Sequence, residues 1–397
     1  MPDKYDRLLA CRGLVTELSF PGRKDRLTAC PTEDSINVKI SVLTDIPSPY
    51  QVEILNEIAR DKENSLQVAY LRRRDPSRQW NDVPIHHDFV SLSDGPTHLA
   101  EARRRFAEAD LVVFNYYRHP SAELLIQERA KSTRPWCFWG ERPGLRKPEW
   151  AGRLLRMRKL RWLHSSPTPI WGIGKFAVDT YRSEFGPKRQ YFNLPYFSNL
   201  QRFSNSSNSR NGGSERTFLF SGSLIPRKGV DLLADAFIRL MKEGHKARLR
   251  IIGDGALRSS LKKTLSPVAS TVEFAGFVDW PDVAPQYATS HVLCVPSRYD
   301  GWGMVVSEGL ASGLPVIATD RTGAALEFVE TGRNGWLIPT DNADALFNAM
   351  LEAVTMPAST LAQFSRSAQQ SIADHSLEQG ASRFKEYSAQ VVSSWTT

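Results

Sequence analysis

Residues 298–313 read Arg-Tyr-Asp-Gly-Trp-Gly-Met-Val-Val-Ser-Glu-Gly-Leu-Ala-Ser-Gly. The apolar run 292–295 before this stretch predicts a buried strand, and residues 304–312 predict a short helix that follows a glycine-interrupted turn. The free amides at the start of such a helix are a favourable place for an anion. Asp300 and Glu308 put a carboxylate on each side of those amides. A ligand with a diphosphate and hydroxyl groups, such as a nucleotide sugar, suits this arrangement.

The same stretch resembles the acidic-x7-acidic signature of retaining family 4 glycosyltransferases, whose pattern is P-S-x-x-E-G-F-G-x-x-x-x-E-A. The chain has Asp300 where the family usually has Glu, and Trp302 where Phe is usual. The resemblance implies that Asp300 contacts the hydroxyls of the donor sugar and that Glu308 contacts the ribose. It also implies that the amides of Trp302, Gly303 and Met304 bind the diphosphate.

The composition is that of an ordinary globular protein. The chain has 397 residues, of which 41% are hydrophobic and 24% charged, and this length allows two domains. The net charge is +8 and the whole surplus lies in residues 1–200, which indicates an anionic partner for the first half. Four cysteines without paired spacing predict reduced thiols, a cytoplasmic location and no metal cluster. No apolar run approaches the roughly 20 residues of a membrane span.

Strand-like and helical runs alternate along the chain, which is typical of parallel sheets with crossover helices. The predicted strands are 38–44, 66–71, 111–116, 136–139, 169–171, 218–220, 249–252, 272–274, 292–295, 316–318 and 336–338. The predicted helices are 50–60, 230–242, 257–265, 304–312, 343–354 and a helical region at 360–395.

This α/β pattern resembles the GT-B fold, in which two Rossmann-like domains face each other across a cleft. We expect residues 1–35 to be an N-terminal extension, residues 36–197 to be the acceptor-binding domain and residues 217–375 to be the nucleotide-sugar-binding domain. Residues 198–216 are rich in Ser, Asn and Gly and predict a linker that buries no core. Residues 376–397 are expected to form a helix that packs toward the N-terminal domain.

Residues 220–229 read Phe-Ser-Gly-Ser-Leu-Ile-Pro-Arg-Lys-Gly. They resemble the family pattern G-R-L-x-x-x-K-G, with Gly222 as its first glycine and Ser223 at the arginine position. The resemblance assigns Lys228 to the donor diphosphate, and Arg227 is expected to supply the charge that Ser223 lacks. Cations at a helix start oppose the helix dipole, so an anion-binding role is favoured over the alternative of a solvated pair.

Two further stretches resemble the family. Residues 251–255 form a Gly-Asp-Gly turn after a strand, which is as consistent with a plain turn as with a contact to the nucleotide base. Residues 322–335 resemble the pattern G-G-x-x-E-x-V-x-x-G-x-x-G, with Glu327 as a structural residue that holds this loop over the site.

Three candidate residues follow predicted strands of the N-terminal half. His119 is a candidate catalytic residue, because many relatives carry a histidine in this loop, near the donor sugar, and a solvated surface histidine is the alternative. Glu141 is a candidate for the acceptor side, because it ends a strand where open α/β sheets bind ligands, and pairing with Arg142 is the alternative. Tyr50 belongs to the proline-rich first loop and is a second acceptor-side candidate.

Residues 146–162 hold seven cations and one acid, with apolar residues interleaved between them. A basic amphipathic helix of this kind can lie on an anionic membrane surface. The alternative is a domain helix whose apolar stripe packs on its own sheet and whose cations are solvated.

The resemblance implies a retaining hexosyltransferase of the EC 2.4 type. It would move a hexose from a nucleoside-diphosphate sugar to a hydroxyl of a glycan or glycolipid, such as a lipid-linked or polysaccharide precursor of the cell envelope. His119, Asp300 and Lys228 are the predicted catalytic residues. We expect no cofactor and no tightly bound metal, because the chain has no Asp-x-Asp triplet. A peripheral position at the inner face of the membrane is the matching location.

Two other classes of protein are alternatives to this function. A catalytically silent glycosyltransferase-like partner subunit is the first alternative, because of Asp300 and Ser223. Residues 172–177 match G-x-G-x-x-A loosely, so a dinucleotide-dependent oxidoreductase is a distant alternative. No nucleic-acid recognition motif accompanies the basic first half, so we expect no nucleic-acid partner.

Overall fold

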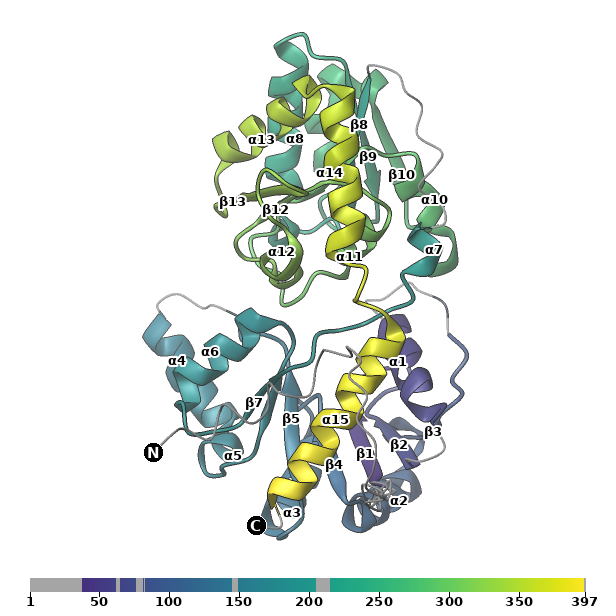
Figure 1. The fold of residues 1–397 in the computed structure, drawn as a ribbon, viewed down its shortest axis with the longest axis vertical. Helices are drawn as coiled ribbons and strands as arrows, with labels where there is room; N and C mark the ends of the chain where they lie inside the picture. Colours follow the sequence, from purple (N-terminus) through teal and green to yellow (C-terminus); the bar gives the residue numbers. More distant parts are fainter. Residues whose placement is uncertain are drawn as a thin grey trace, which may run out of the picture. The chain divides into compact units, whose positions relative to one another are not determined.

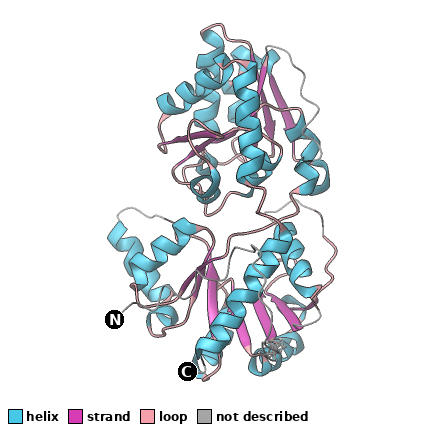
Figure 2. Cartoon of the chain, in the orientation of Figure 1, coloured by secondary structure: helices cyan, strands magenta, loops and turns pink. Residues whose placement is uncertain are grey.

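The computed structural model describes residues 38–61, 65–75, 81, 83–144, 149–204 and 215–395. These residues form two parallel β-sheets with helices around them, as Figures 1 and 2 show. The predicted α/β class with two parallel sheets is therefore confirmed. The predicted extension at 1–35 lies outside the described residues, as do residues 205–214 of the predicted linker. That the two domains face across a cleft stays a prediction.

The first sheet has seven strands in the order β3-β2-β1-β4-β5-β6-β7. They are β1 (Lys39–Thr44), β2 (Ser65–Tyr70), β3 (Asp88–Ser91), β4 (Leu111–Phe114), β5 (Trp136–Gly140), β6 (Ile170–Gly172) and β7 (Tyr191–Asn193). The helices of this half are α1 (Pro49–Ala59), α2 (Pro96–Glu108), α3 (Pro120–Lys131), α4 (Glu149–Lys159), α5 (Arg161–His164) and α6 (Lys175–Phe185). The strand order reverses between β1 and β4, and open α/β sheets bind ligands at the carboxyl ends of the strands at such a point.

The second sheet has six strands in the order β10-β9-β8-β11-β12-β13. They are β8 (Arg216–Ser221), β9 (Ala247–Ile252), β10 (Val272–Gly276), β11 (Val292–Val295), β12 (Val316–Thr319) and β13 (Gly335–Ile338). The helices that follow the short α7 (Gln201–Ser204) are α8 (Val230–Lys242), α9 (Arg258–Thr264), α10 (Ala284–Ala288), α11 (Met304–Ala311), α12 (Gly323–Phe328), α13 (Ala343–Thr355) and α14 (Ala358–Ser371). Here the order reverses between β8 and β11, so the loops after these strands meet at one edge.

Strands β3 and β7 are absent from the predicted strands, and one residue of the predicted linker is buried. Strands β3 and β7 are the edges of the first sheet, and edge strands lack the continuous apolar run that marks a strand buried on both faces. Residues 198–216 were expected to bury no core, but Phe203 on α7 is fully buried, with its ring 5.2 Å from that of Tyr287. A single aromatic residue hardly changes the polar composition of this stretch, so the composition does not indicate that Phe203 is buried.

The last helix, α15 (Leu377–Trp395), packs on the first sheet and not on the sheet that precedes it in the chain. It contacts α1 and β4, and it lies beside these elements in Figure 1. Its Phe384 ring is edge-on to Trp171, with 5.2 Å between the ring centroids, and to Trp139, at 6.4 Å. The predicted return of the C-terminal helix to the N-terminal half is therefore present in the fold.

Replacing Phe384 with alanine is expected to lower the free energy of unfolding by about 3–5 kcal/mol, because the buried ring would leave a cavity between two tryptophans. Urea unfolding followed by tryptophan fluorescence measures this change. Glu386→Ala, in an exposed position of the same helix, is the control and should stay within about 0.5 kcal/mol of the parent. Equal stability of the two variants would show that α15 contributes little to the first core.

Candidate functional site

The loops after β8 and β11 bring a lysine and an aspartate together at the edge of the second sheet. Lys228 ends a short 3₁₀ turn, Pro226–Lys228, and its Nζ lies 2.5 Å from Oδ2 of Asp300. Arg227 Nη1 lies 3.9 Å from the other carboxylate oxygen. Gly222 lies beside the lysine stem, where a Cβ would be 3.9 Å from Lys228 Cε, and its φ of 151° favours glycine. Four of the residues singled out in the sequence are thus neighbours in space.

Ion pairs and backbone bonds hold the loop that carries Asp300. Arg298 binds both carboxylate oxygens of Asp231, at 2.8 and 2.7 Å, and its Nε binds Asp341 at 2.6 Å. The Asp300 amide donates to the Arg321 carbonyl at 2.9 Å. These contacts fix Asp300 before any ligand arrives, which is the condition for precise contacts with a bound sugar.

The start of α11 follows directly on this loop. Gly303 is the N-cap residue, with a φ of 88° that favours glycine, and Met304 is the first helical residue. The Trp302 side chain is only 1% exposed and lies edge-on to Phe328, with 5.8 Å between the ring centroids. Trp302 as a whole is therefore buried, and Gly303 and Met304 are the partly exposed residues of this turn. The use of amides 302–304 stays a prediction.

Glu308 lies on α11 and is 3% exposed. The hydroxyl of Tyr287, itself fully buried, donates to Glu308 Oε2 at 2.8 Å. Burial raises the pKa of Glu308 to about 7, and the bond from Tyr287 opposes part of that rise. A carboxyl held in this way by one donor keeps acceptor positions for a second donor, such as a ribose hydroxyl.

Of the acceptor-side candidates, Glu141 comes close to the Asp300 loop. A Cβ on Gly301 would lie only 2.1 Å from Glu141 Oε2. The Glu141 carboxylate can therefore lie this close to the Asp300 loop because residue 301 is a glycine. The Tyr181 hydroxyl donates to the Glu141 carbonyl at 2.6 Å. Tyr50, in the first turn of α1, packs against Tyr196, with 4.9 Å between the ring centroids. The contacts place Glu141, but not Tyr50, next to the Asp300 loop.

His119 caps helix α3. Its Nδ1 accepts a hydrogen bond of 3.2 Å from the Ser121 amide, and this bond accounts for the position of the ring without a substrate. A catalytic role of His119 stays a prediction. Within the described ranges, no three His, Cys, Asp or Glu side chains are grouped as ligands for a metal ion.

A polar network lies at the reversal point of the first sheet, and none of its residues is among the candidates taken from the sequence. Gln51 Nε2 donates to Asn115 Oδ1 at 2.6 Å, and the Thr44 hydroxyl lies 3.1 Å from both side chains. Asn115 directly follows β4 and also donates to the Trp139 carbonyl at 2.9 Å. The rule that singled out Glu141, a polar residue at the carboxyl end of a buried strand, would have found Asn115 as well.

The basic segment 146–162 forms helices α4 and α5, apart from residues 146–148, which lie outside the described residues. Leu160 and Trp162 are buried, as the alternative of a packed domain helix requires. However, three apolar side chains of α4 are exposed, namely Leu154 at 57%, Leu155 at 45% and Met157 at 44%. No helix in the described part of the chain has the length and apolar character to cross a bilayer.

Comparison with known proteins finds similarity over the second sheet. Residues 215–356 match the family model described as glycosyl transferases group 1. A glycosyltransferase of Methanocaldococcus jannaschii is 36% identical over 145 residues, which are 36% of this chain and 40% of that protein. A Mycobacterium tuberculosis protein described as a GDP-mannose-dependent alpha-(1-6)-phosphatidylinositol monomannoside mannosyltransferase is 25% identical over 284 residues, 68% of this chain and 73% of its own. The chain thus spans less than half of the first relative's length and about three quarters of the second's.

The fold as a whole is that of GT-B proteins. The structure of the Anabaena protein HepE in complex with UDP and glucose superposes with a TM-score of 0.68 and covers 89% of this chain and 100% of that chain. The two sequences are 16% identical, so the likeness shows the fold alone. The predicted GT-B class is therefore confirmed.

Proposed function

We propose that this protein moves a hexose from a nucleoside-diphosphate sugar to a hydroxyl of an acceptor, with retention of the anomeric configuration. The pair of Lys228 and Asp300 beside the start of α11 carries this proposal, because it puts a cation, a carboxylate and helix amides within one small region. A diphosphate needs the cation and the amides, and sugar hydroxyls need the carboxylate. The match of residues 215–356 to group 1 glycosyl transferases supports the same assignment.

Each residue then has a defined task. Lys228 leaves Asp300 and binds the diphosphate together with Arg227 and the amides of residues 302–304. Asp300, once released, accepts hydrogen bonds from the donor-sugar hydroxyls, while Glu308 accepts them from the ribose. Preorganised cations and amides stabilise the charge that grows on the leaving diphosphate.

The transfer step breaks the bond between the anomeric carbon and the diphosphate oxygen and forms a bond from that carbon to the acceptor oxygen. The acceptor hydroxyl loses its proton to the departing diphosphate on the same face of the sugar. This route needs no protein base at the reacting carbon, so His119 would orient the sugar. We expect no tightly bound metal, because Lys228 and Arg227 supply the positive charge.

The donor and acceptor are further parts of the proposal. The Mycobacterium relative is described as GDP-mannose-dependent, and the Anabaena structure holds UDP and glucose, so GDP- and UDP-sugars are the first donors to test. A glycan or glycolipid acceptor agrees with the phosphatidylinositol mannoside in the name of the former. We place the reaction in the cytoplasm, at the inner face of the membrane.

A panel of UDP-, GDP- and ADP-sugars tests the function. A bound donor should raise the melting temperature by mass action, and one base should stand out. Slow hydrolysis of that donor separates an active enzyme from the silent partner subunit, which would bind the donor without cleaving it. A panel in which no nucleotide sugar binds would overturn the proposal.

We also propose that α4 docks on an anionic membrane surface. Leu154, Leu155 and Met157 are exposed, and the last turn carries Arg156, Arg158 and Lys159. Arg156 pairs with Glu184 at 2.8 Å, so Arg158 and Lys159 are the exposed cations of that turn. Exposed apolar side chains beside cations are what an interfacial helix presents to acidic lipid headgroups.

Exchanging Leu154, Leu155 and Met157 for glutamine should abolish binding to vesicles of phosphatidylglycerol and phosphatidylcholine. Burial of three such side chains in the interface contributes several kcal/mol, so partitioning should fall at least about a hundredfold. Co-flotation measures bound protein. Leu124→Gln, at an exposed site on α3, is the control. The docking proposal fails if the parent protein does not float with acidic vesicles, or if the triple variant floats equally well.

A further inference from the structure

Arg142, the second residue after β5, is a buried cation with unfilled hydrogen-bonding capacity. The residue is 6% exposed, and its Nε is buried and has no hydrogen-bond partner among the residues that the structure describes. Its guanidinium stacks on the Phe176 ring, with 3.6 Å between its central carbon and the ring centroid. Burial lowers its pKa to about 10, so the group still carries its charge at neutral pH.

Another buried arginine of the same half shows what a purely structural role looks like. Arg129 is 4% exposed, and it donates to the carbonyl oxygens of Phe106, Ala109 and Pro135 at 2.7 to 3.1 Å. Its guanidinium ties α3 to the end of α2 and to the residue before β5. In the part of the chain that the structure describes, the Arg142 guanidinium has no such carbonyl and forms no ion pair. Stacking on Phe176 recovers only a small part of the cost of removing the charge from water.

The place of Arg142 in the fold indicates what the missing partner is. It lies at the carboxyl end of β5, next to the acceptor-side candidate Glu141, whereas the residues assigned to the donor lie on the second sheet. The Tyr299 hydroxyl donates to the Arg142 carbonyl, which joins this segment to the loop of Asp300. An exposed Gly144 follows two residues later, so the segment reaches solvent there. The basic helix α4 follows in the chain, so positive charge extends along one stretch of sequence.

We infer that Arg142 binds an anionic group, a phosphate or a carboxylate, of the sugar acceptor. This inference rests on the proposed function, because it names the chemical class of the acceptor for that reaction. A planar guanidinium recognises both groups through paired hydrogen bonds, and it does so most strongly where water is excluded. Acceptors that carry a phosphate close to the receiving hydroxyl, or a uronic acid, belong to this class.

The test measures binding of two small probes in the presence of saturating UDP or GDP, which occupies the Lys228 site. Glycerol 3-phosphate represents a phosphate acceptor and glucuronate a carboxylate acceptor, and titration calorimetry gives both dissociation constants. Arg142→Met retains an apolar stem against Phe176 and removes the charge, so binding of the probe should weaken at least about tenfold. Arg142→Lys should retain part of the affinity, because it keeps the charge without the paired geometry.

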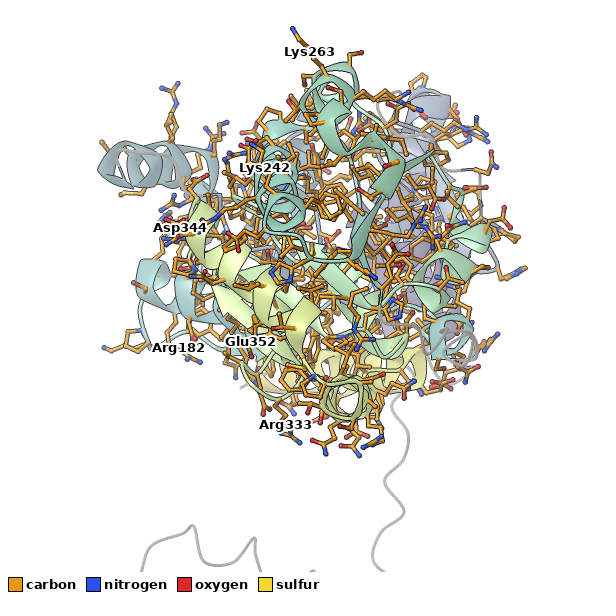
Figure 3. All side chains as sticks on the ribbon, turned by 90° about the horizontal axis from the view of Figure 1, so that it is seen from above. Arg182, Lys242, Lys263, Arg333, Asp344 and Glu352 are labelled. Carbon is orange, nitrogen blue, oxygen red and sulfur yellow. The ribbon has the colours of Figure 1, made fainter. Side chains whose placement is uncertain are left out.

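Arg182→Met is the matched control. Arg182 lies on α6, the helix that carries Phe176, and it is labelled at the outer side of the molecule in Figure 3. It is exposed and bonds only weakly to Asp179, at 3.3 Å, so its variant should bind the probes like the parent. Melting temperatures of all variants without ligand check that the fold is intact.

The outcomes separate the inference from the proposed function. Arg142-dependent binding of one probe alone identifies the anion as a phosphate or as a carboxylate. Arg142-dependent binding of both probes shows that Arg142 recognises negative charge. No binding of either probe to the parent protein, or unchanged binding by Arg142→Met, overturns the inference. Loss of UDP or GDP binding in Arg142→Met would show that the guanidinium contacts the donor, and this result would also overturn the inference. If the parent binds neither nucleotide, the donor assignment fails, while the same titration without nucleotide still tests Arg142.

Discussion

Replacing Lys228 with alanine is expected to lower the rate of sugar transfer by about 10²–10³-fold, the usual effect of removing one preorganised donor from a developing anion. The ammonium group lies 2.5 Å from Asp300 and is the nearest cation to that carboxylate. Arg227 stands further away and would replace only part of its charge. Single-turnover transfer of labelled sugar measures the rate, and the thermal shift with the nucleotide measures binding.

Two further variants make this result specific. Lys242→Ala removes an exposed cation at the end of α8, which is labelled in Figure 3, and should transfer sugar at the parent rate. Lys228→Arg keeps a charge on a longer stem and should recover part of the activity. If Lys228→Ala turns over at near the parent rate with an unchanged melting temperature, the lysine does not serve the diphosphate.

Glu308→Gln is expected to weaken binding of the nucleotide about tenfold to a hundredfold. A neutral amide can still accept the bond from Tyr287, but it is a weaker acceptor for the ribose hydroxyls than a carboxylate. Because the pKa of Glu308 is raised to about 7, the affinity of the parent for its nucleotide should rise as the pH increases through 7. The affinity of the variant should lack this rise. Calorimetric titrations from pH 6 to 8 measure both.

Glu308→Gln should weaken nucleotide binding but increase the stability of the protein without ligand at high pH. The folded protein holds the Glu308 proton more tightly than the unfolded chain, whose glutamates titrate near 4.5, so ionisation between these values destabilises the fold. Stability is therefore lost as the pH rises from 4.5 to 7, by up to about 3 kcal/mol. Glu308→Gln lacks this loss and should be the more stable protein at pH 8 without ligand, as urea unfolding would show.

Glu352→Gln is the control for both measurements, because Glu352, which is labelled in Figure 3, is exposed on α13. It should leave nucleotide affinity and its pH dependence unchanged. A Glu308→Gln variant that binds nucleotide as tightly as the parent at pH 8 would remove the ribose contact from the proposed site. The stability result would still stand, since it depends on burial alone.

The bounds of a central strand and of a long amphipathic helix could be predicted from the sequence. The strand at Val292–Val295 was predicted with its observed ends, and α8 was predicted at Val230–Lys242, because both carry long apolar patterns that burial requires. The motifs at Gly222, Lys228 and Asp300 lie in different parts of the sequence, and the structure brings these residues together. Their roles at the site stay predictions.

Contacts between distant residues could not be predicted in this way. The bond from Tyr287 to Glu308 depends on how α10 meets α11, and the burial of Trp302 depends on Phe328, 26 positions later in the chain. The sequence left open whether Leu154 faces a core or the solvent, because an amphipathic helix fits both, and the structure shows it exposed. In the sequence, Arg142 is only a possible ion-pair partner of Glu141. The order of residues does not show whether a buried side chain has a hydrogen-bond partner.

The packing of α15 against Trp171 and Trp139 has a consequence for folding during synthesis. The ribosome makes the first sheet before the second, and the helix that covers these tryptophans emerges only after both. Until then the nascent first half exposes an aromatic surface, which is a target for chaperones and for aggregation. A fragment that ends near residue 197 should for the same reason be poorly soluble, and addition of a peptide with the sequence of α15 should rescue it.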